Sequence, residues 1–358
     1  MRKLIKLLPA YLLFRRFGRP VKLPLNLTLG VTYRCNSRCK TCNVYTRKVR
    51  ELSLEEWDSV FAMYGKKLFW ATISGGEPFI RNDLAEIVCR LYDKCAPSII
   101  NIPTNGLLTD RIVSVVRQIA VYCRRSQIII NVSLDGIAEE HDIIRGVKGG
   151  YSHAIETFNK LKSLQNDNLS VGIHTVISVF NVNRISTIHD ELVRMGPDSY
   201  ITEIAEERTE LLTRGSGITP SITEYGKAID YLTEKLKKDT FGKVGRLTRA
   251  FRIRYYQMVK RVLAEKKQII PCYSGFASAQ IAPDGDVWMC CIQADAIGNL
   301  RDSGYDFKKV WISERANKYR KVIKAGGCHC PLANASYTNM LFDPKSIFAV
   351  IKNLILIK

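Results

Sequence analysis

Residues 68–88 read "LFWATISGGEPFIRNDLAEIV". An apolar run comes first, a Gly-Gly-Glu-Pro turn follows at 75–78, and a helical pattern opens at Asn82 or Asp83. Glycines allow the backbone to approach a ligand closely, and a carboxylate beside them can pair with an ammonium group. The stretch therefore predicts a strand that ends in a ligand-binding turn and continues into a helix, although a plain strand–helix turn would read the same way.

The same alternation runs through the first 205 residues. Strand-like runs rich in Val and Ile cover 25–31, 69–74, 98–103, 127–133, 170–178 and 199–204. Helical patterns lie between them at about 53–66, 82–95, 108–122, 150–165 and 184–195. Alternation of this kind predicts parallel strands joined by crossover helices, with polar turns at the C-terminal ends of the strands. We therefore expect an α/β fold, a partial (β/α)6 TIM-like barrel, with its reactive face at that end.

Residues 33–45, "YRCNSRCKTCNVY", place cysteines at positions 35, 39 and 42. A structural zinc site normally closes with four ligands, and the next cysteine is Cys89. The odd count of 11 cysteines and the lack of a cleavable signal pattern favour a reducing compartment over a disulfide framework. Iron–sulfur clusters bind thiolates at short spacings, and three ligands leave one iron free. The triplet alone leaves a cluster, a zinc site and structural cysteines open.

The Cys-x3-Cys-x2-Cys spacing and the strand, Gly-Gly-Glu-Pro turn and helix that follow it resemble the radical S-adenosylmethionine (SAM) superfamily. The resemblance implies a 4Fe–4S cluster held by three cysteines, Cys35, Cys39 and Cys42. Its fourth iron would be chelated by the amino and carboxylate groups of SAM. The resemblance also implies that the turn binds SAM through Gly75, Gly76 and Glu77, with the carboxylate facing the ammonium group.

Residues 132–151, "VSLDGIAEEHDIIRGVKGGY", are similar to the branch of this superfamily that modifies peptides and other metabolites. By that resemblance Ser133 contacts the ribose of SAM and Arg145 its methionyl carboxylate, which an Arg fork matches bidentately. The plainer alternative makes Arg145 a basic residue on a solvated loop. Asn105 and Asp135 precede glycines and are interpreted as turn residues.

The superfamily usually carries an aromatic residue just before the third cysteine, where it touches the adenine of SAM. This chain has Thr41 at that position. Tyr33 and Tyr45 are the neighbouring aromatic residues, so they are the candidates to compensate.

A second cysteine group lies near the C-terminus. Residues 271–291, "PCYSGFASAQIAPDGDVWMCC", read as a hairpin of two apolar strands joined by Pro-Asp-Gly, which brings its ends together. A late Cys-x-Cys pair follows in 326–335. The spacing resembles the SPASM and twitch extensions of radical SAM enzymes. The resemblance implies auxiliary-cluster ligands from both segments: Cys272, Cys290, Cys328 and Cys330.

The number of cysteines favours one auxiliary 4Fe–4S cluster. The longer SPASM pattern binds two clusters and needs about seven cysteines, whereas this tail has five with Cys291 included. Cys291 could replace a neighbouring ligand, and a zinc site built from the same thiols remains open. Cys89, Cys95 and Cys123 fall in helical segments and are expected to be small apolar core residues.

The chain is strongly basic, with a formal net charge of +20. The first 50 residues contain 13 Lys or Arg and no acid, and residues 241–267 add nine bases against one Glu. Such a surface attracts nucleic acid, anionic lipid or an acidic substrate. Nucleic acid is the less favoured partner, because the chain shows no RNA-binding module or stacking motif.

The two chain ends combine these charges with apolar residues. "LIKLLPAYLLFRRFGR" (4–19) and "SIFAVIKNLILIK" (346–358) are both shorter than the roughly 20 apolar residues that span a bilayer. Both suit helices that lie in a membrane interface, although Pro9 would kink the first. The alternative is that both ends pack on the barrel. We therefore keep peripheral membrane contact open for an otherwise cytoplasmic protein.

These patterns divide the chain into a basic amphipathic segment (1–24), a radical SAM barrel (25–210), a helical basic connector (211–270), a SPASM/twitch-like domain (271–340) and an amphipathic tail (341–358). The resemblance implies reductive cleavage of SAM to a 5′-deoxyadenosyl radical that abstracts hydrogen from a substrate, with electrons from a donor such as a flavodoxin or ferredoxin. The first expected substrate is a membrane-associated or lipid-linked small molecule. The alternatives are a ribosomally made peptide and, without catalysis, a zinc-bound binding scaffold.

Overall fold

The computed structural model describes residues 2–238 and 243–357, so Met1, residues 239–242 of the expected connector and Lys358 of the expected tail lie outside the described part. The strands are β1 (Asn26–Thr32), β2 (Trp70–Gly75), β3 (Ile99–Thr104), β4 (Gln127–Ser133), β5 (Leu169–Ile177), β6 (Ser199–Ile204), β7 (Ser278–Ile281), β8 (Asp286–Trp288) and β9 (Ala296–Asn299). The described helices are α1 (Arg2–Phe17), α2 (Leu54–Tyr64), α3 (Leu84–Cys95), α4 (Thr109–Tyr122), α5 (Glu139–Arg145), α6 (Gly150–Lys162), α7 (Ile185–Val193), α8 (Ile222–Lys238), α9 (Lys243–Glu265), α10 (Phe307–Trp311), α11 (Glu314–Ala325), α12 (Ala333–Met340) and α13 (Pro344–Leu356).

The first six strands form the parallel, unclosed barrel that the sequence predicts. The strand order in the sheet is β6-β5-β4-β3-β2-β1-β7-β8-β9, and β1 to β6 pair in parallel. Each of these six strands begins and ends within one residue of its predicted range. The short helix α5 is not predicted by the sequence, because its seven residues are too few to show a helical period.

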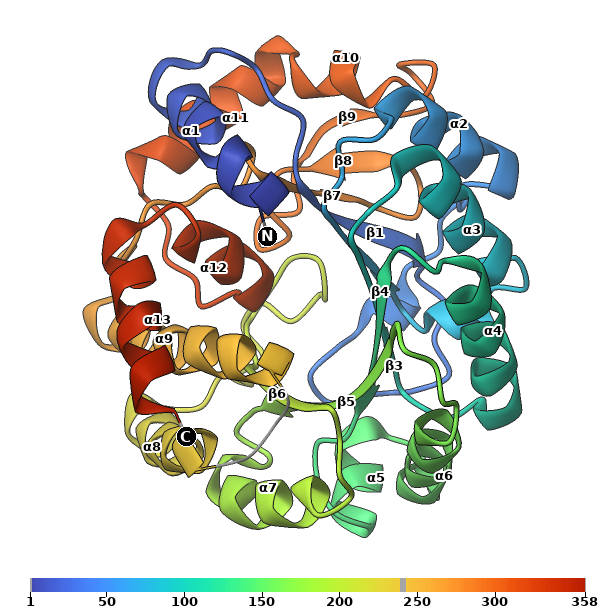
Figure 1. Ribbon diagram of the computed structural model, residues 1–358, viewed down its shortest axis with the longest axis vertical. Helices are drawn as coiled ribbons and strands as arrows, with labels where there is room; N and C mark the ends of the chain where they lie inside the picture. Colours follow the sequence, from blue (N-terminus) through green and yellow to red (C-terminus); the bar gives the residue numbers. More distant parts are fainter. Residues whose placement is uncertain (1, 239–242, 358) are drawn as a thin grey trace.

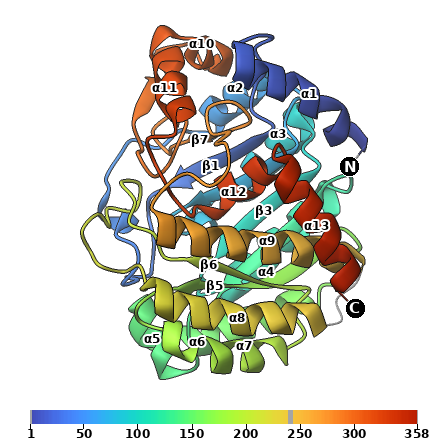
Figure 2. The same cartoon turned by 90° about the vertical axis from the view of Figure 1, so that its left-hand side faces the viewer.

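The sheet curls into an open barrel, with α2, α3, α4 and α6 on its outer face (Figure 1). Its open side is covered by α9 and α12, which lie across the inner face (Figures 1 and 2). Arg252 of α9 donates to the Tyr200 carbonyl of β6 at 3.0 Å, and Asn26 of β1 donates to the Thr338 hydroxyl of α12 at 3.1 Å. Helices from the C-terminal third of the chain therefore cover the side that the strands leave open.

The two faces of the sheet differ in polarity. Outward-facing side chains such as Leu29 are completely buried. On the inner face, Thr28 lies opposite Gln280 of β7 and Thr72 of β2. The row continues with Asn101 of β3 opposite Thr72. Small barrels are usually filled with branched apolar side chains, so this inner face instead offers hydrogen-bonding groups to a polar ligand.

The C-terminal hairpin extends the barrel sheet and does not form a sheet of its own. β7 pairs in parallel with β1, and β8 pairs antiparallel with β7. The turn between them holds the predicted Pro-Asp-Gly, and Gly285 has a φ of +91°, which favours glycine. The predicted hairpin is confirmed, and it attaches the second cysteine group to the same sheet as the first.

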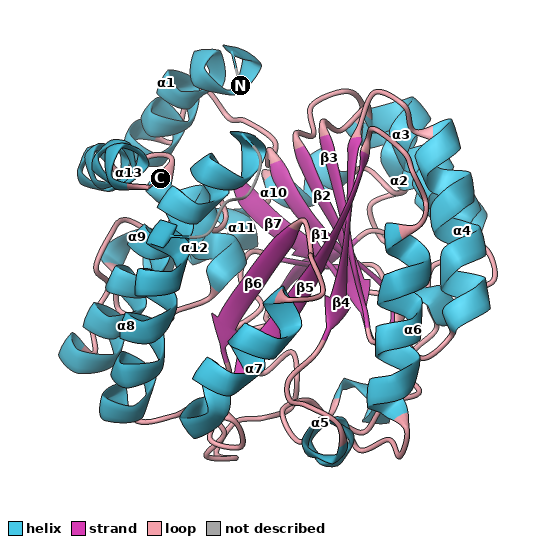
Figure 3. Ribbon diagram, turned by 60° about the horizontal axis from the view of Figure 1, so that its bottom comes forward, coloured by secondary structure: helices cyan, strands magenta, loops and turns pink. Residues whose placement is uncertain are grey.

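Both chain ends are helical, and α1 and α13 lie on one side of the molecule (Figures 2 and 3). α1 contains Pro9 within its span. α13 begins with Pro344, whose fixed φ suits the first turn of a helix. Within the described part of the chain, no helix is long and apolar enough to cross a membrane.

Candidate functional site

The first cysteine loop, residues 35–42, is fixed by the end of α5. The amide of Arg38 donates to the Arg145 carbonyl at 3.0 Å, and the amide of Lys40 donates to the Ile144 carbonyl at 2.9 Å. Gly146 follows α5 with a φ of +66°, and a Cβ there would lie 2.4 Å from the Arg38 carbonyl oxygen. Only glycine fits between the helix end and the loop, so the unpredicted helix α5 positions the cysteines.

The two glycines after β2 pack against the strand that leads into the same loop. A Cβ on Gly75 would lie 2.0 Å from the Thr32 carbonyl oxygen, and one on Gly76 would lie 2.2 Å from that of Arg34. The amides of Gly76 and Glu77 donate to these two carbonyls at 2.7 and 2.9 Å. The sequence predicts a close backbone approach here, and the structure shows this approach to the chain's own cysteine loop.

Glu77 is held at this junction as a buried carboxylate. Its Oε1 accepts from the Thr104 hydroxyl at 3.0 Å and the Phe79 amide at 3.2 Å, and its Oε2 accepts from the Asn105 amide at 2.7 Å. Burial raises the pKa of Glu77 to about 7, while these hydrogen bonds and the charge of Arg145 oppose the rise. A cationic ligand beside it would favour the charged form.

Asn105 is more than the turn residue that the sequence indicates. Its Nδ2 donates to Asn36 Oδ1 at 2.7 Å and to Ser37 Oγ at 3.0 Å, and it lies 4.0 Å from Cys35 Sγ. The side chain thus ties the end of β3 to the cysteine loop. An Asn-Gly pair at the C-terminal end of a barrel strand is the only sequence signal that could have identified it.

Arg145 and Asp135 form a buried ion pair next to the loop. Arg145 Nε lies 2.8 Å from Asp135 Oδ2, and its Nη1 lies 3.8 Å from Cys39 Sγ. The Arg145 side chain is only 14% exposed, so the solvated-loop alternative is wrong. The other carboxylate oxygen, Asp135 Oδ1, accepts from the Val176 amide at 2.8 Å. Asp135, interpreted from the sequence as a turn residue, therefore orients the guanidinium group.

The remaining predicted site residues are Ser133 and the two tyrosines near Thr41. Ser133 is nearly buried at the end of β4, opposite His174 in the parallel register. Tyr33 is buried in a small apolar cluster, and the Arg47 guanidinium lies 5.3 Å from its ring centroid. The Arg38 guanidinium lies over the ring of Tyr45, 4.2 Å from the ring centroid. Both tyrosines therefore have cationic partners inside the protein.

The donor set of the first loop fits an iron–sulfur cluster. Burial, with the charges of Cys39 and Cys35 acting in the same direction, raises the pKa of Cys42 to about 12, and burial also raises the pKa of Cys35. These two thiols are therefore protonated without metal, and iron binding would release protons. The Ser37 amide lies 3.4 Å from Cys35 Sγ, so one thiolate has an N–H partner besides those from Asn105 and Arg145.

Among the described residues, no three His, Cys, Asp or Glu side chains lie close enough together to hold one ion. Zinc holds each thiolate at about 2.3 Å, which draws the sulfurs together, whereas a cluster of several irons spreads them apart.

The second cysteine group also comes together in the structure. Cys272 precedes β7, Cys290 follows β8, and the late pair follows α11. Burial raises the pKa of Cys290 to about 11, and the charges of Cys272 and Cys328 act in the same direction. The pKa of Cys330 is raised by burial, then by Glu206, Cys290 and Cys272. Besides burial, the charge of Cys272 raises the pKa of each of the other three thiols, and the number of thiols fits a closed cluster site.

Cys291 has a different neighbour. It is buried, and its Sγ lies 3.9 Å from Arg208 Nη1. A cavity of about 80 Å³ lies beside it and reaches from Cys290 to Thr28 and Ser74 on the inner face of the sheet. The second cysteine group therefore borders the polar interior of the barrel.

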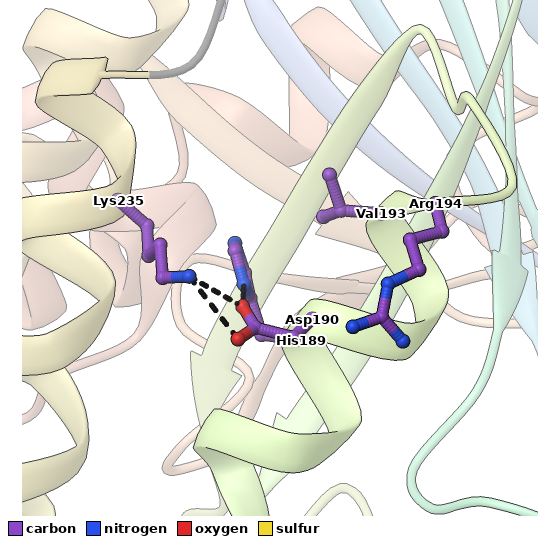
Figure 4. A pocket seen from close by; sticks show the side chains of 5 residues that line it. All are labelled: His189, Asp190, Val193, Arg194 and Lys235. Carbon is purple, nitrogen blue, oxygen red and sulfur yellow. Dashed lines mark hydrogen bonds and ion pairs between the residues drawn. The ribbon is translucent and has the colours of Figure 1, made fainter.

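A larger cavity of about 240 Å³ lies on the outer helical layer, between α7 and α8 (Figure 4). Asp190 occupies its wall and pairs with Lys235 at 2.9 Å. No cysteine lines this cavity, and Asp190 is already paired with Lys235 and His189, so it is not the cofactor site.

The other cysteines follow the prediction in part. Cys95 and Cys123 are buried in the core, as expected. Cys89 is only half-buried, and its thiol forms a hydrogen bond with that of Cys123. The core prediction is therefore incomplete for Cys89.

The chain matches two protein families. Residues 29–192 match the Radical SAM superfamily, and residues 272–331 match SPASM, an iron–sulfur cluster-binding domain. Both cysteine groups fall inside or at the edge of these matches, which agree with the resemblance drawn from the sequence.

Several curated proteins are similar. The chain is 30% identical over 244 residues to Fe-coproporphyrin III synthase of Methanosarcina barkeri, covering 65% of this chain and 56% of that protein. It is 23% identical over 296 residues to the subtilosin biosynthesis protein AlbA of Bacillus subtilis (79% and 59%). It is 26% identical over 337 residues to mycofactocin maturase MftC of Mycolicibacterium smegmatis (89% and 78%). The chain thus spans little more than half the length of the first two proteins.

Solved structures share the fold. SuiB of Streptococcus suis, bound to S-adenosylmethionine, superposes with a TM-score of 0.64 at 14% identity, covering 87% of this chain and 71% of that one. The enzyme anSMEcpe, with bound AdoMet and a peptide, gives 0.60 at 15% identity, covering 93% and 97%. The chain therefore carries a domain of the Radical SAM superfamily and a C-terminal SPASM iron–sulfur cluster-binding domain, and the cofactors of these domains are 4Fe–4S clusters and SAM.

Proposed function

We propose that this protein is a radical SAM maturase that modifies a ribosomally made peptide. The observation that carries the proposal is the alignment with mycofactocin maturase MftC, which covers most of both chains. AlbA and the sporulation killing factor maturation protein SkfB of Bacillus subtilis, which is 28% identical over 179 residues, add weight. These relatives favour a peptide over the lipid-linked small molecule that the sequence alone places first.

Cys35, Cys39 and Cys42 are proposed to hold the cluster that binds SAM. When bound, this cluster supplies the electron that cleaves SAM to methionine and a 5′-deoxyadenosyl radical. The support for the assignment is the convergence of three N–H donors on the loop sulfurs, from Ser37, Asn105 and Arg145. N–H groups aimed at sulfur stabilise the thiolate form that binds iron.

The buried charges beside the loop are proposed to bind the amino acid end of SAM. Glu77 would pair with the ammonium group, because it is a carboxylate held in place by three donors and without a cation of its own in hydrogen-bond contact. Arg145 would pair with the carboxylate through its Nη groups, since Asp135 takes the Nε side. Asp135 is then a positioning residue.

The glycines and Ser133 have supporting roles in this proposal. Gly75 and Gly76 allow the turn to lie against the cysteine loop, so that Glu77 reaches the same place as the thiols. Ser133, at the C-terminal end of β4, would face the ribose.

Cys272, Cys290, Cys328 and Cys330 are proposed to hold one auxiliary 4Fe–4S cluster. Four thiols leave no iron open, so this cluster would move electrons and would not bind substrate directly. Cys291, with Arg208 against its sulfur, is left out of the ligand set. The cavity beside Cys290 places the auxiliary site next to the polar barrel interior, where a peptide side chain would react.

The electron donor is proposed to be an acidic flavodoxin or ferredoxin. The net charge of +20 gives the molecule a field that attracts an acidic protein and speeds its encounter.

The test is turnover of a peptide. Anaerobically reconstituted protein is incubated with SAM, dithionite and each short peptide encoded beside its gene, and the peptide mass is followed together with 5′-deoxyadenosine. We expect one peptide to change mass in step with 5′-deoxyadenosine release. Because one relative is Fe-coproporphyrin III synthase, the parallel incubation contains that class of tetrapyrrole. Conversion of the tetrapyrrole and of no peptide would reject the proposal.

A further inference from the structure

The C-terminal helix α13 buries polar side chains and exposes several large apolar ones. Its buried side chains recur every three or four residues as Ser346, Val350, Asn353 and Ile357, the last just beyond its end, so two of the four are polar. Both polar side chains are hydrogen-bonded inside the molecule. Ser346 Oγ accepts from Arg254 Nε at 3.1 Å, and Asn353 Nδ2 donates to the Ala250 carbonyl at 3.2 Å. α13 is thus attached to α9 through two polar contacts, beside the apolar packing of Val350 and Ile357 in the core.

Four large apolar side chains of α13 are exposed on the outside of the protein. Phe348 is 71% exposed and Ile355 is 80% exposed, and Ile351 and Leu356 are more than half exposed. A helix that packs on a core normally buries such residues and exposes its polar ones. A contiguous set of exposed large apolar residues on a helix marks an interaction surface.

Helix α1 adds a second outward apolar strip. Its inner side packs through Tyr11 against Phe342 and through Phe14 against Phe276. Its outer side exposes Leu12, Leu13 and Phe17, of which Phe17 is 70% exposed.

The two helices share one side of the molecule (Figures 2 and 3). We call this the terminal face, defined by the exposed apolar residues Leu12, Leu13, Phe17, Phe348, Ile351, Ile355 and Leu356.

The exposed charged side chains of the two helices are all basic. Arg16, Arg19, Lys345 and Lys352 are exposed on or next to the two helices. Neither helix contains Asp or Glu. The neighbouring Asp343 is the N-cap of α13 and accepts from the Ser346 amide at 2.8 Å. The face therefore combines apolar residues with a positive rim.

We propose that the terminal face docks on the surface of an anionic lipid bilayer. Exposed apolar side chains would enter the boundary between headgroups and acyl chains, and the Lys and Arg side chains would pair with anionic headgroups. A second copy of this chain is the less suitable occupant, because two terminal faces would bring like charges together in a molecule of net charge +20. The inference does not depend on the proposed peptide substrate.

Docking in this way fixes the direction of the barrel mouth. The loops after β1 and β6 meet where the Asn43 amide donates to the Leu211 carbonyl at 3.0 Å. These loops project on the side of the molecule opposite to α1 and α13 (Figure 2). A lipid-docked molecule therefore presents its mouth to water, where it receives a substrate from solution.

The test measures co-sedimentation of the reconstituted full-length protein with vesicles of phosphatidylcholine alone and of phosphatidylcholine with one quarter phosphatidylglycerol. We expect binding to the anionic vesicles to be roughly tenfold or more stronger than to the neutral ones, and to weaken as salt rises. Equal binding to both vesicles, or no binding to either, overturns the proposal.

Two variants with closely matched exposure locate the contact. Ile351→Ser changes a residue that is 52% exposed on the terminal face, and Val121→Ser changes one that is 51% exposed on α4. We expect Ile351→Ser combined with Ile355→Ser to weaken vesicle binding roughly tenfold or more, and Val121→Ser to leave it unchanged. Vesicle binding that survives the double variant contradicts the proposal.

Two further readouts separate the alternatives. Iron content and 5′-deoxyadenosine release should be unchanged in the double variant, which shows that the protein is folded and that its cofactor sites are independent of docking. Light scattering reports the oligomeric state. A dimer that the double variant dissociates, without vesicle binding by the unaltered protein, assigns the face to a second copy and overturns the lipid proposal.

Discussion

The two cysteine groups of this molecule are assembled in opposite ways. The first comes from a single loop, Cys35–Cys42, and is held by the end of α5 and the glycine turn after β2. The second comes from three separate segments between Cys272 and Cys330, which a hairpin and the end of α11 bring together. The first group therefore depends on local spacing and a few neighbours, whereas the second depends on the folding of the whole C-terminal region.

Their surroundings differ as well. Glu77, Asp135 and Arg145 are buried charges beside the first group. Beside the second, Cys330 packs near Leu332 and Ala335 in a small apolar cluster, and the charged residues nearby are the buried Glu206 and Arg208, whose Nη1 lies 3.9 Å from Cys291 Sγ. Three thiols with buried charges of both signs suit a zwitterionic co-substrate, and four thiols suit a cluster that the protein ligates completely. The comparison teaches that the number of ligands distinguishes a reactive cluster from an auxiliary one, because both groups have charged residues nearby.

The largest expected effect separates the two groups by iron content. Reconstituted protein should hold about eight irons per chain. Cys39→Ala and Cys328→Ala should each lower the content to about four, because each removes one ligand from a different group. Iron analysis with electron paramagnetic resonance of the reduced protein checks this. The control Cys89→Ala lies outside both groups and should retain all the iron.

Loss of all iron from either single variant would contradict the independence of the two groups. Purification of the unaltered protein with stoichiometric zinc and no iron would favour the binding scaffold.

A smaller effect is expected for the charge that faces the SAM ammonium group. Glu77→Gln should weaken SAM binding about 10- to 100-fold, since charged hydrogen bonds are worth roughly 1.5–3 kcal/mol. Isothermal titration of the reconstituted protein checks this, and Glu86→Gln on the exposed face of α3 is the matched control. Unchanged affinity in Glu77→Gln would place the ammonium group elsewhere.

The pH dependence of SAM binding sharpens the same assignment. Burial raises the pKa of Glu77 to about 7, so without ligand the carboxyl is protonated below that pH. Only the ionised form pairs with ammonium, so SAM affinity should rise between about pH 6 and 8. Glu77→Gln should lack this rise. A pH-independent affinity in the unaltered protein would contradict the assignment.

The smallest effect concerns the link between the two regions. Arg301, in the loop after β9, donates from Nε to Glu56 Oε1 of α2 at 2.6 Å and from Nη2 to Oε2 at 3.0 Å. Arg301→Ala should lower the free energy of unfolding by about 2 kcal/mol, because it removes the bidentate partner of a nearly buried carboxylate, which then keeps only the Ser53 amide, the Tyr305 hydroxyl and the exposed Arg50. Arg315→Ala removes an exposed pair with Asp295 and should cost less than about 1 kcal/mol.

The acid side of the stability curve tests the same pair. The Arg301 hydrogen bonds lower the pKa of Glu56 to about 2, so its stabilising effect is complete above its ordinary pKa near 4.5 and is lost as pH falls toward 2. Denaturant unfolding at pH 7 and pH 3 should show a smaller difference between Arg301→Ala and the unaltered protein at pH 3. An equal difference in the free energy of unfolding at pH 7 and pH 3 would show that the ion pair does not cause the loss of stability.

The sequence predicts the barrel well because each strand is a continuous apolar run, which has one stable placement in a sheet covered by helices. It predicts the first cysteine group because the three cysteines lie within one short loop. It predicts the second because one hairpin brings its cysteines together. It does not predict α5, Asn105 or Asp135 as part of the site, because a short polar helix and Asn-Gly or Asp-Gly pairs read as ordinary turns. Their contacts with the cysteine loop arise from residues more than 60 positions away.

For the adenine of SAM, proximity in the sequence suggests candidate residues but does not show their surroundings. Tyr33 and Tyr45 are near Thr41 in the sequence. In the structure, Tyr33 is buried in an apolar cluster, and the Arg38 guanidinium lies over the ring of Tyr45. Proximity along the chain does not show which contacts an aromatic ring makes, because those depend on the residues that the fold brings against the ring.

The most direct test of the central claim is the release of 5′-deoxyadenosine from SAM by the reconstituted protein under dithionite, compared with Cys39→Ala and Cys328→Ala. The account predicts release by the unaltered protein, release that persists in Cys328→Ala, and none in Cys39→Ala. Release that continues in Cys39→Ala, or that is absent from an unaltered protein loaded with iron, would contradict it.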